Sequence, residues 1–561
     1  MRRAGIFLLA VIALVAMASP VFAQPKVTIS GVMDTVTTWS NNLSSVDNNY
    51  ARASDHEWYS RLRVRPDITA EVGTTKFVLG LEIAGTYGQT GSAGAVGSLG
   101  GTANAANTGA GGAGSFPQRF GQTAGWQLNT DIQGAIEIKW AYTEFDMPII
   151  PVPTRFRVGA QPWEAHYKFA VLASGDFAGL HMTNQWNPMI KTNFTYAQIE
   201  EQSTGVRDAF IRGDDFAIVA SVEITPFQGL VLRPIFSYAS LQGVTSVASR
   251  TGKGGIGTGA GNFPTGNAGA VNPATGQIFA QSAIEDRFTV GVDARWRFGP
   301  FSLAPTVFYQ FGSRDQVVPF QNGMTNGNFN TLREDAWFVD IRGGWQAGPL
   351  LLELAGIYTT GNRASDRIDL NQSRVKYYQP ISTDTAYYAT WAEFWALGVD
   401  YSSIVHGTIP GLNPGVSIGY DKYGLIRAGT RASYLVTPDF TVRAAFNANW
   451  TAEAVDTQTS TIVGASGIAP CTATGFAAAV AAAGQAACNP TGNASYLGSE
   501  VNLGFQWRFL PNVTLDVVGA YQWAGNALSS VTALNANTGV ATSAKAPHDA
   551  QLVTMRIRYR F

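Results

Sequence analysis

The chain has 561 residues, of which only 14% are charged, and its formal net charge is -1. This balance excludes a general polycation, and we expect no nucleic-acid partner. The two cysteines exclude a disulfide-built scaffold, and the 12% of aromatic residues excludes a disordered chain.

The first 23 residues are predicted to be a secretory signal peptide. Arg2 and Arg3 form a basic start, an apolar run follows, and Val21-Phe22-Ala23 offers small residues for cleavage before Gln24. The apolar run is too short for a transmembrane anchor, which is the alternative interpretation. We therefore expect residues 24–561 to form the mature protein, as a single domain without a helical membrane span.

Polar and apolar residues alternate along most of the mature chain, which is typical of strands with one face of each kind. In the last strand Val553, Met555 and Ile557 share one face, and Arg556 and Arg558 share the other. Eighteen strands are predicted, at residues 26–39, 55–72, 75–89, 131–146, 154–162, 177–186, 189–201, 214–225, 230–241, 285–298, 301–313, 333–347, 350–361, 417–436, 438–452, 496–510, 512–524 and 549–561. Sixteen strands are the alternative, and residues 391–403 fit either an additional strand or a folded-in loop.

The connectors between these strands alternate in length. Short turns that contain Gly, Pro or Asn follow one end of the strands, and long segments follow the other end. The long loops are expected at about 90–130, 241–284, 362–416, 456–495 and 525–548. This asymmetry, together with aromatic residues near the strand ends, favours an all-β, antiparallel, up-and-down transmembrane barrel over a soluble sandwich.

The sequence resembles Gram-negative outer-membrane porins. The resemblance rests on the signal peptide, the alternating connectors and the last strand, which ends in Tyr559-Arg560-Phe561. It covers the whole mature chain, and the strand number and arginine content are similar to the alginate-export and substrate-specific porin classes. The resemblance implies a place in the cell outer membrane, in contact with lipid and lipopolysaccharide. It also implies assembly by the barrel-assembly machinery through Phe561, and a homotrimer as one arrangement of the subunits.

Strand parity places a set of arginines on the inner, pore-lining face. These are Arg61, Arg63, Arg65, Arg155, Arg157, Arg295, Arg297, Arg342, Arg427, Arg431, Arg556, Arg558 and Arg560. Closure of the barrel would bring the last strand to within one strand of the second, so that their arginines form a basic wall. Such a wall would favour small hydrophilic anions. The alternative is that inward acids pair with these arginines and make the wall rigid.

The connector after the fifth strand is a candidate constriction. In trimeric porins this connector folds into the pore, and here its position matches by resemblance. Acidic, basic and aromatic side chains follow each other closely in it: Trp163, Glu164, His166, Tyr167, Lys168 and Asp176. An ordinary surface loop is the competing interpretation.

Other chemistry has little support in the sequence. The histidines are scattered and form no HExxH motif, so we expect no metal site, no cofactor and no enzymatic activity. Cys471 and Cys488 lie in one predicted long loop and are expected to form a disulfide. The function predicted is a passive channel. The alternative is a barrel that serves as anchor or sheath for an export or electron-transfer complex.

Overall fold

The computed structural model describes residues 26–42, 56–86, 133–168, 171–200, 215–241, 285–317, 329–363, 366, 374–381, 391–395, 398–399, 423–455, 461–464, 467–470, 492–527, 533–534, 541–543 and 548–561. Within these ranges, no helix is long and apolar enough to cross a membrane. The predicted signal peptide, both cysteines and most of the predicted long loops lie outside the described residues.

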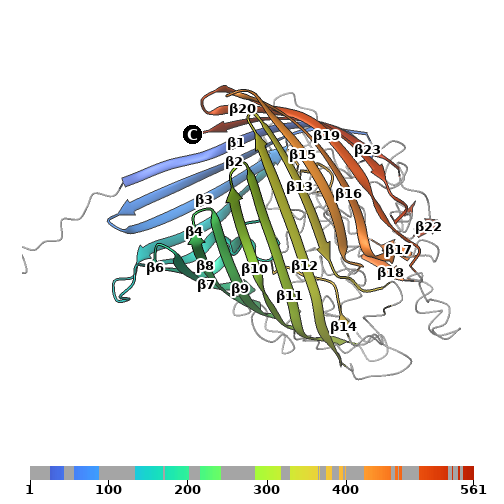
Figure 1. The fold of residues 1–561 in the computed structure, drawn as a ribbon. Helices are drawn as coiled ribbons and strands as arrows, with labels where there is room; N and C mark the ends of the chain where they lie inside the picture. Colours follow the sequence, from blue (N-terminus) through green and yellow to red (C-terminus); the bar gives the residue numbers. More distant parts are fainter. Residues whose placement is uncertain are drawn as a thin grey trace, which may run out of the picture.

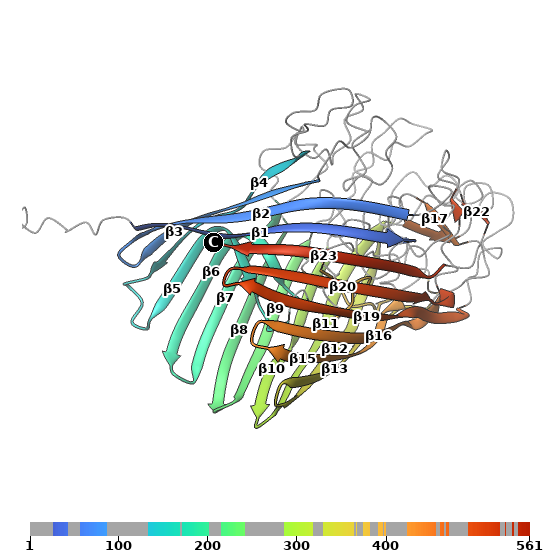
Figure 2. The ribbon, with the colours of Figure 1, turned by 90° about the horizontal axis from the view of Figure 1, so that it is seen from above.

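Eighteen antiparallel strands close into one barrel (Figures 1 and 2). They are β1 (Lys26–Asn41), β2 (His56–Val72), β3 (Thr75–Thr86), β4 (Gln133–Asp146), β5 (Thr154–Glu164), β6 (Ser174–Asn187), β7 (Ile190–Glu200), β8 (Asp215–Phe227), β9 (Leu230–Leu241), β10 (Glu285–Phe298), β11 (Phe301–Val317), β12 (Phe329–Ala347), β13 (Leu350–Thr359), β15 (Leu425–Thr437), β16 (Phe440–Val455), β19 (Ala494–Leu510), β20 (Val513–Ala524) and β23 (Ala550–Arg560). The predicted fold class and strand number are confirmed.

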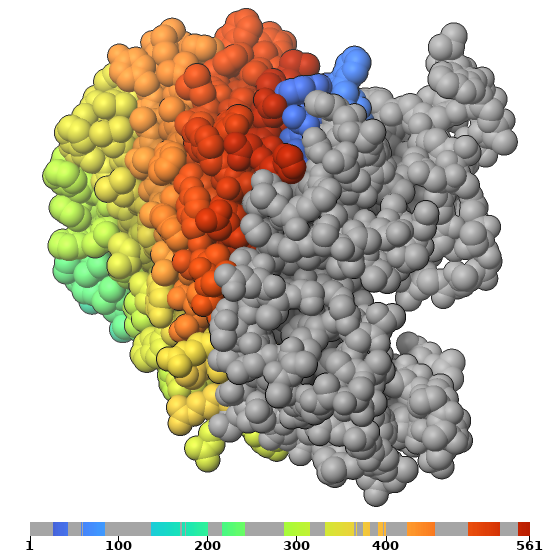
Figure 3. Space-filling model, turned by 90° about the vertical axis from the view of Figure 1, so that its right-hand side faces the viewer, coloured from blue at the N-terminus to red at the C-terminus, as the bar shows by residue number. Residues whose placement is uncertain are grey.

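The barrel closes where the first strand meets the last. β1 pairs with β2 on one side and with β23 on the other, and in Figures 2 and 3 the blue N-terminal strands lie beside the red C-terminal ones. Two hydrogen bonds between the backbones of Gly31 and Phe561, of 2.9 and 3.1 Å, complete this seam at the end of the chain.

Five short strands lie outside the main barrel wall. β14 (Arg374–Val375) pairs in parallel with β12, while β17 (Thr461–Gly464) pairs with β18 (Gly467–Pro470) and β21 (Ala533–Leu534) with β22 (Ala541–Ser543). Residues 391–395 and 398–399 are not a strand; they lie against the inner wall, which agrees with the folded-in alternative.

Short turns join the strands at one end of the barrel, which we call the turn end; the opposite end is the loop end. Gly73, Gly299 and Gly348 occupy three of these turns with φ of 60°, 59° and 56°. Only glycine adopts this left-handed region without steric cost, so these residues allow each strand to reverse within two residues. The tight turns hold neighbouring strands in register.

The outward face of the barrel is apolar, with rows of aromatic side chains at both ends. At the loop end Tyr196, Phe216, Tyr238, Phe288 and Phe311 follow each other across β7 to β11, with ring centroids 4.9 to 6.0 Å apart. Similar contacts recur at the turn end between Trp296, Phe298 and Phe301, and between Tyr559 and Phe561. The period-two pattern therefore sorts side chains as predicted, apolar ones outward and charged ones inward.

Candidate functional site

The connector between β5 and β6 folds into the lumen. Its neck is closed by a hydrogen bond of 2.9 Å from the backbone N–H of Ala165 to the carbonyl of Ala173. Inside the loop, Nε2 of His166 accepts hydrogen bonds from the backbone N–H groups of Leu172 and Ala173, at 3.1 and 2.9 Å. Burial lowers the pKa of His166 to about 3, so its imidazole is neutral near pH 7. This histidine shapes the loop and does not face solvent.

Tyr167 forms the inward contact of this loop with the opposite strands. Its ring lies between the guanidinium groups of Arg233 on β9 and Arg295 on β10, which are 3.9 and 4.0 Å from the ring centroid. Its hydroxyl donates to Glu223 on β8 at 2.9 Å, and its backbone N–H donates to Asp293 on β10. Two cations over one aromatic ring hold the side chain firmly in place.

Lys168 secures the loop to a further strand. Its Nζ lies 3.0 Å from Oδ1 of Asp340 on β12 and donates to the carbonyl oxygen of the same residue at 2.6 Å. Arg342 pairs with Asp340 as well, at 2.8 Å. Because the Lys168 ammonium is only 3% exposed, burial lowers its pKa to about 8. Lys168 therefore begins to lose its charge slightly above physiological pH.

The predicted constriction residues on the strands flank this loop. Trp163 packs against Phe177, with ring centroids 5.0 Å apart. Glu164 is exposed and interacts electrostatically with Arg295 and Arg233. Asp176 pairs with Lys139 at 2.7 Å. The six residues are thus brought into one region of the lumen, as predicted for a constriction, but whether they limit permeation stays a prediction.

The inner wall beneath this loop is apolar. Phe308, Phe338 and Ile357, on β11 to β13, are at most 3% exposed and form one cluster with Val171 and Leu172 of the loop. The connector that follows β13 covers the same cluster: the Tyr378 ring packs against Phe338 at a tilt, with 4.9 Å between ring centroids. Its hydroxyl also donates to the carbonyl of Val171 at 2.7 Å. Two inward connectors therefore share one hydrophobic core inside the barrel.

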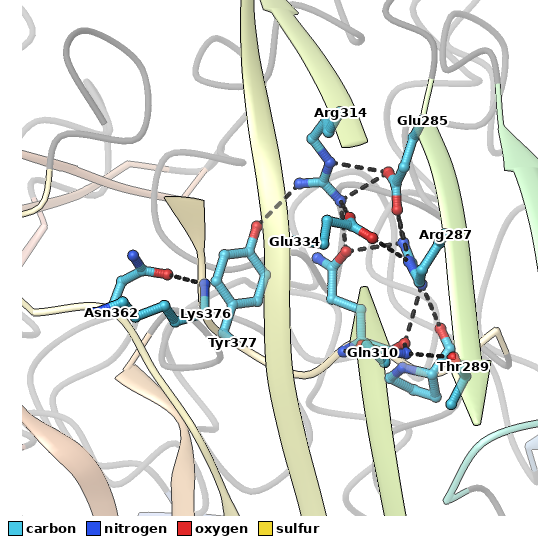
Figure 4. Close-up of polar contacts among 11 residues, drawn as sticks. Glu285, Arg287, Thr289, Gln310, Arg314, Glu334, Asn362, Lys376 and Tyr377 are labelled. Atoms are coloured by element: carbon cyan, nitrogen blue, oxygen red, sulfur yellow. Dashed lines mark hydrogen bonds and ion pairs between the residues drawn. The ribbon is translucent and has the colours of Figure 1, made fainter. Parts of the chain in front are cut away.

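A cluster of four buried charges lies nearer the loop end of this wall (Figure 4). We call it the charge cluster; it consists of Glu285, Arg287, Arg314 and Glu334, whose side chains are at most 5% exposed. Nε of Arg287 donates to Glu285 at 2.6 Å, and Nε of Arg314 donates to the same carboxylate at 2.9 Å. Nη1 of Arg314 donates to the Tyr377 hydroxyl at 3.1 Å.

A third inward segment, residues 391–395 and 398–399, lies against β15 to β23. The carboxylate of Glu500 accepts hydrogen bonds from the backbone N–H groups of Glu393 and Phe394, at 2.6 and 3.0 Å. Arg427 donates to the carbonyl of Trp395 at 3.0 Å, and Arg431 lies 4.9 Å from the ring centroid of Trp391. These two predicted pore-lining arginines therefore support an inward segment.

Six inward arginines line the barrel seam, and we call them the seam arginines. They are Arg61, Arg63, Arg65, Arg556, Arg558 and Arg560. The register places Arg61 and Arg556 opposite one β1 residue, Arg63 and Arg558 opposite the next inward one, and Arg65 and Arg560 opposite a third. The predicted juxtaposition across β1 is therefore present.

Acids pair with several seam arginines. Asp34 on β1 binds Arg558 through two hydrogen bonds of 2.6 and 2.7 Å, and Asp516 on β20 pairs with Arg556 at 2.9 Å. Glu82 on β3 is shared: Arg63, Arg65 and Lys139 lie 2.6, 2.8 and 3.5 Å from its oxygens.

The other predicted pore-lining arginines differ in their partners. Arg155 and Arg157 share Glu144, at 2.7 and 3.3 Å, and Arg431 pairs with Glu353. Arg295 and Arg297 are exposed, and within the described ranges no carboxylate lies within ion-pair distance of either. The described part of the lumen thus contains arginines with and without an ion-pair partner.

Sequence reasoning missed three parts of this arrangement. Arg314 lay at the edge of a predicted loop, although β11 extends to Val317 and its alternation continues through Gln310 and Arg314. The contacts of Tyr377 and Gln379 had no sequence signal. In the part of the chain that the structure describes, no three metal-binding side chains gather at one place.

No family model matches this sequence, and no curated protein sequence matches it either. Solved structures that align with the chain include a BenF-like porin from Pseudomonas fluorescens Pf-5, at 9% identity and a TM-score of 0.46, covering 96% of this chain and 99% of that one. Pseudomonas aeruginosa OccK8 (OprE) aligns at 9% identity and a TM-score of 0.44, over 95% and 98% of the two chains. Acinetobacter baumannii OccAB3 aligns at 8% and 0.43, over 95% and 99%.

Proposed function

We propose that the protein is an outer-membrane channel for small hydrophilic solutes that favours anions. The outward face supports a membrane location, because apolar side chains such as Leu354 and Leu503, 66% and 67% exposed, would otherwise meet water. Aromatic rows near both ends of that face suit the two membrane–water interfaces. Residues 1–23 would direct the chain across the inner membrane as a cleaved signal peptide.

The observation that carries the anion preference is the sharing of Glu82. Glu82 serves Arg63 and Arg65 and lies 3.5 Å from Lys139, which also pairs with Asp176, so that two carboxylates serve three cations. The two strands that close the barrel add few acids, since β1 contains only Asp34 and β23 contains none. A surplus of fixed positive charge in a lumen with low-dielectric walls attracts anions and repels cations.

The loop after β5 folds into the lumen, which supports a pore that narrows beside positively charged side chains. Arg295 is exposed beside the fixed ring of Tyr167, on β10, five strands away from β5 along the barrel wall. A solute that passes this loop would therefore meet the positive charge of Arg295, which forms no ion pair with a carboxylate in the described part of the chain. Homotrimer formation and contacts with lipopolysaccharide stay proposals.

The test is the reversal potential of the purified barrel across a KCl gradient in a planar lipid bilayer. We expect chloride preference in the wild type, and a shift toward potassium in the triple variant Arg61→Gln, Arg63→Gln and Arg65→Gln. Arg363→Gln is the matched control, because this arginine is 76% exposed and lies 4.0 Å from Glu453. Potassium preference in the wild type would refute anion selectivity, and absence of current would favour the anchor or sheath role.

A further inference from the structure

Residues 374–381, which we call the latch segment, lie inside the barrel although they belong to a connector. The segment begins beside β12, where Arg374 pairs with Arg333 and Val375 with Glu334 in a parallel bridge. It ends at Ile381, whose backbone N–H donates to the carbonyl of Leu172 at 2.7 Å. The latch segment thus connects the charge cluster to the constriction loop.

Gln379 is the residue through which the wall holds this segment. Its backbone N–H donates to Oε1 of Gln310 at 2.9 Å. Its carbonyl oxygen accepts from Arg287 at 3.0 Å and from Gln310 at 2.6 Å. Its side-chain Oε1 accepts from Arg287 at 2.9 Å and from Arg314 at 2.5 Å. These hydrogen bonds exist only while the latch segment lies against the inner wall of the barrel.

The charge cluster contains two arginines and two glutamates, so its formal charges are equal in number. Arg287 and Arg314 also lie 3.8 and 3.9 Å from the oxygens of Glu334 (Figure 4). A buried group of charges is tolerated when it is complete, whereas removing one member leaves a charge that needs water. Tyr377 and Gln379 cover the arginines, so movement of the latch segment away from the wall would admit water to the cluster.

Undocking would also affect the constriction loop. Tyr378 and Ile381 hold Val171 and Leu172 by hydrogen bonds of 2.7 Å each. The same loop carries Tyr167 into the lumen. Loss of the latch segment would therefore remove one support of this loop.

We propose that the latch segment is a gate of the channel, held closed by the charge cluster, and that it opens when the balance of that cluster is broken. The inference rests on the proposed channel function. The gate is formed by a segment of this same chain, so no external ligand is required.

The first test compares variants that remove one charge from the cluster with a variant that removes one charge of each sign. Glu285→Gln and Arg314→Gln each unbalance the cluster, and we expect each to increase single-channel conductance several-fold and to add rapid flickering. The double variant Glu285→Gln/Arg314→Gln restores neutrality, and we expect its conductance to return toward the wild-type value. Single variants that conduct like the wild type, or a double variant as open as the singles, would overturn the proposal.

The second test fixes the segment covalently. A backbone hydrogen bond of 2.7 Å joins Ile381 to Leu172, so the two residues lie next to each other, and a disulfide joins residues whose Cα atoms are about 4.4 to 6.8 Å apart. Leu172→Cys/Ile381→Cys in the Arg314→Gln background should conduct like the wild type when oxidised and open when reduced. Wild-type channels with reductant control for Cys471 and Cys488. An oxidised variant that stays open would contradict the gate.

Hydrogen exchange separates failure of the gate from failure of the channel proposal. The amides of Gln379 and Ile381 are hydrogen-bonded in the docked segment and should be protected in the wild type. We expect that protection to be lost in Arg314→Gln while the strand amides keep theirs, whether or not the barrel conducts. Unchanged protection in Arg314→Gln would refute the latch, whereas lost protection without any current would refute the channel alone.

Discussion

Neutralising Glu82 should increase the anion preference of the channel. The carboxylate of Glu82 is only 10% exposed and lies between Arg63 and Arg65, whose side chains are 23% and 29% exposed. In Glu82→Gln both arginines keep their charge and gain access to lumen water. The variant therefore adds one unit of positive charge to the seam without altering any arginine.

The size of this effect follows from Coulomb's law. A unit charge about 5 Å from a passing ion contributes about 0.8 kcal/mol in water, and screening over a Debye length of about 8 Å reduces this to about 0.4 kcal/mol. That energy enriches a monovalent anion about twofold and depletes a cation by the same factor, so the ratio between them should change about fourfold.

The assay is the reversal potential at physiological salt, repeated at high salt, where screening should suppress the change. Asp439→Asn is the matched control, because it also frees one arginine, Arg508, held at 2.5 Å, but at an exposed turn. A shift toward cations in Glu82→Gln, or no shift at all, would refute the view that the seam charges act on permeating ions. If the ion pairs of Glu82 only make the barrel wall rigid, Glu82→Gln should instead lower the stability of the barrel and leave its ion selectivity unchanged.

Three further predictions concern single residues. Since burial lowers the pKa of Lys168 to about 8, anion preference should decrease as the pH rises through that value, and Lys168→Met should abolish this step in the reversal potential. Phe561→Ala should reduce the amount of assembled barrel in the outer membrane, measured as the heat-modifiable fraction on gels, if the terminal residue is read during assembly. Phe338→Ala should lower the free energy of unfolding in urea by about 3 kcal/mol, because it leaves a cavity in the internal hydrophobic core.

The barrel and its seam could be predicted because they depend on local rules. Alternation assigns Arg61, Arg63 and Arg65 to one face of a strand, and an even number of strands with short turns brings the last strand back to the first. The resulting neighbours, Arg556 and Arg558, follow from closure alone. Strand ends were less predictable, since β11 continues four residues beyond the expected bound, to Val317, where neighbouring strands and not local composition extend the pairing.

The internal core could not be predicted in the same way. Phe308 lies between Val307 and Tyr309, so this part of β11 is apolar on both faces. That pattern indicates that something covers the inner face, but it does not identify the cover. The latch segment has no helical or strand period, and its position depends on tertiary contacts of Gln379 and Tyr378 with distant strands.

Arginine serves two opposite purposes in this lumen, and the ratio of acids to arginines separates them. Arg287 and Arg314 are matched by two glutamates, are at most 5% exposed, and hold a segment of the chain. Arg63 and Arg65 share one glutamate with a lysine and remain in contact with lumen water. A count of inward arginines therefore overestimates the electrostatic field that a solute meets. The arginines that are matched by glutamates hold the latch segment closed instead. Only the arginines that outnumber their acids can select permeating ions by charge. Removing the acid Glu82 should therefore change permeation by altering the electrostatic field in the lumen. Removing the acid Glu285 should change it by opening the gate.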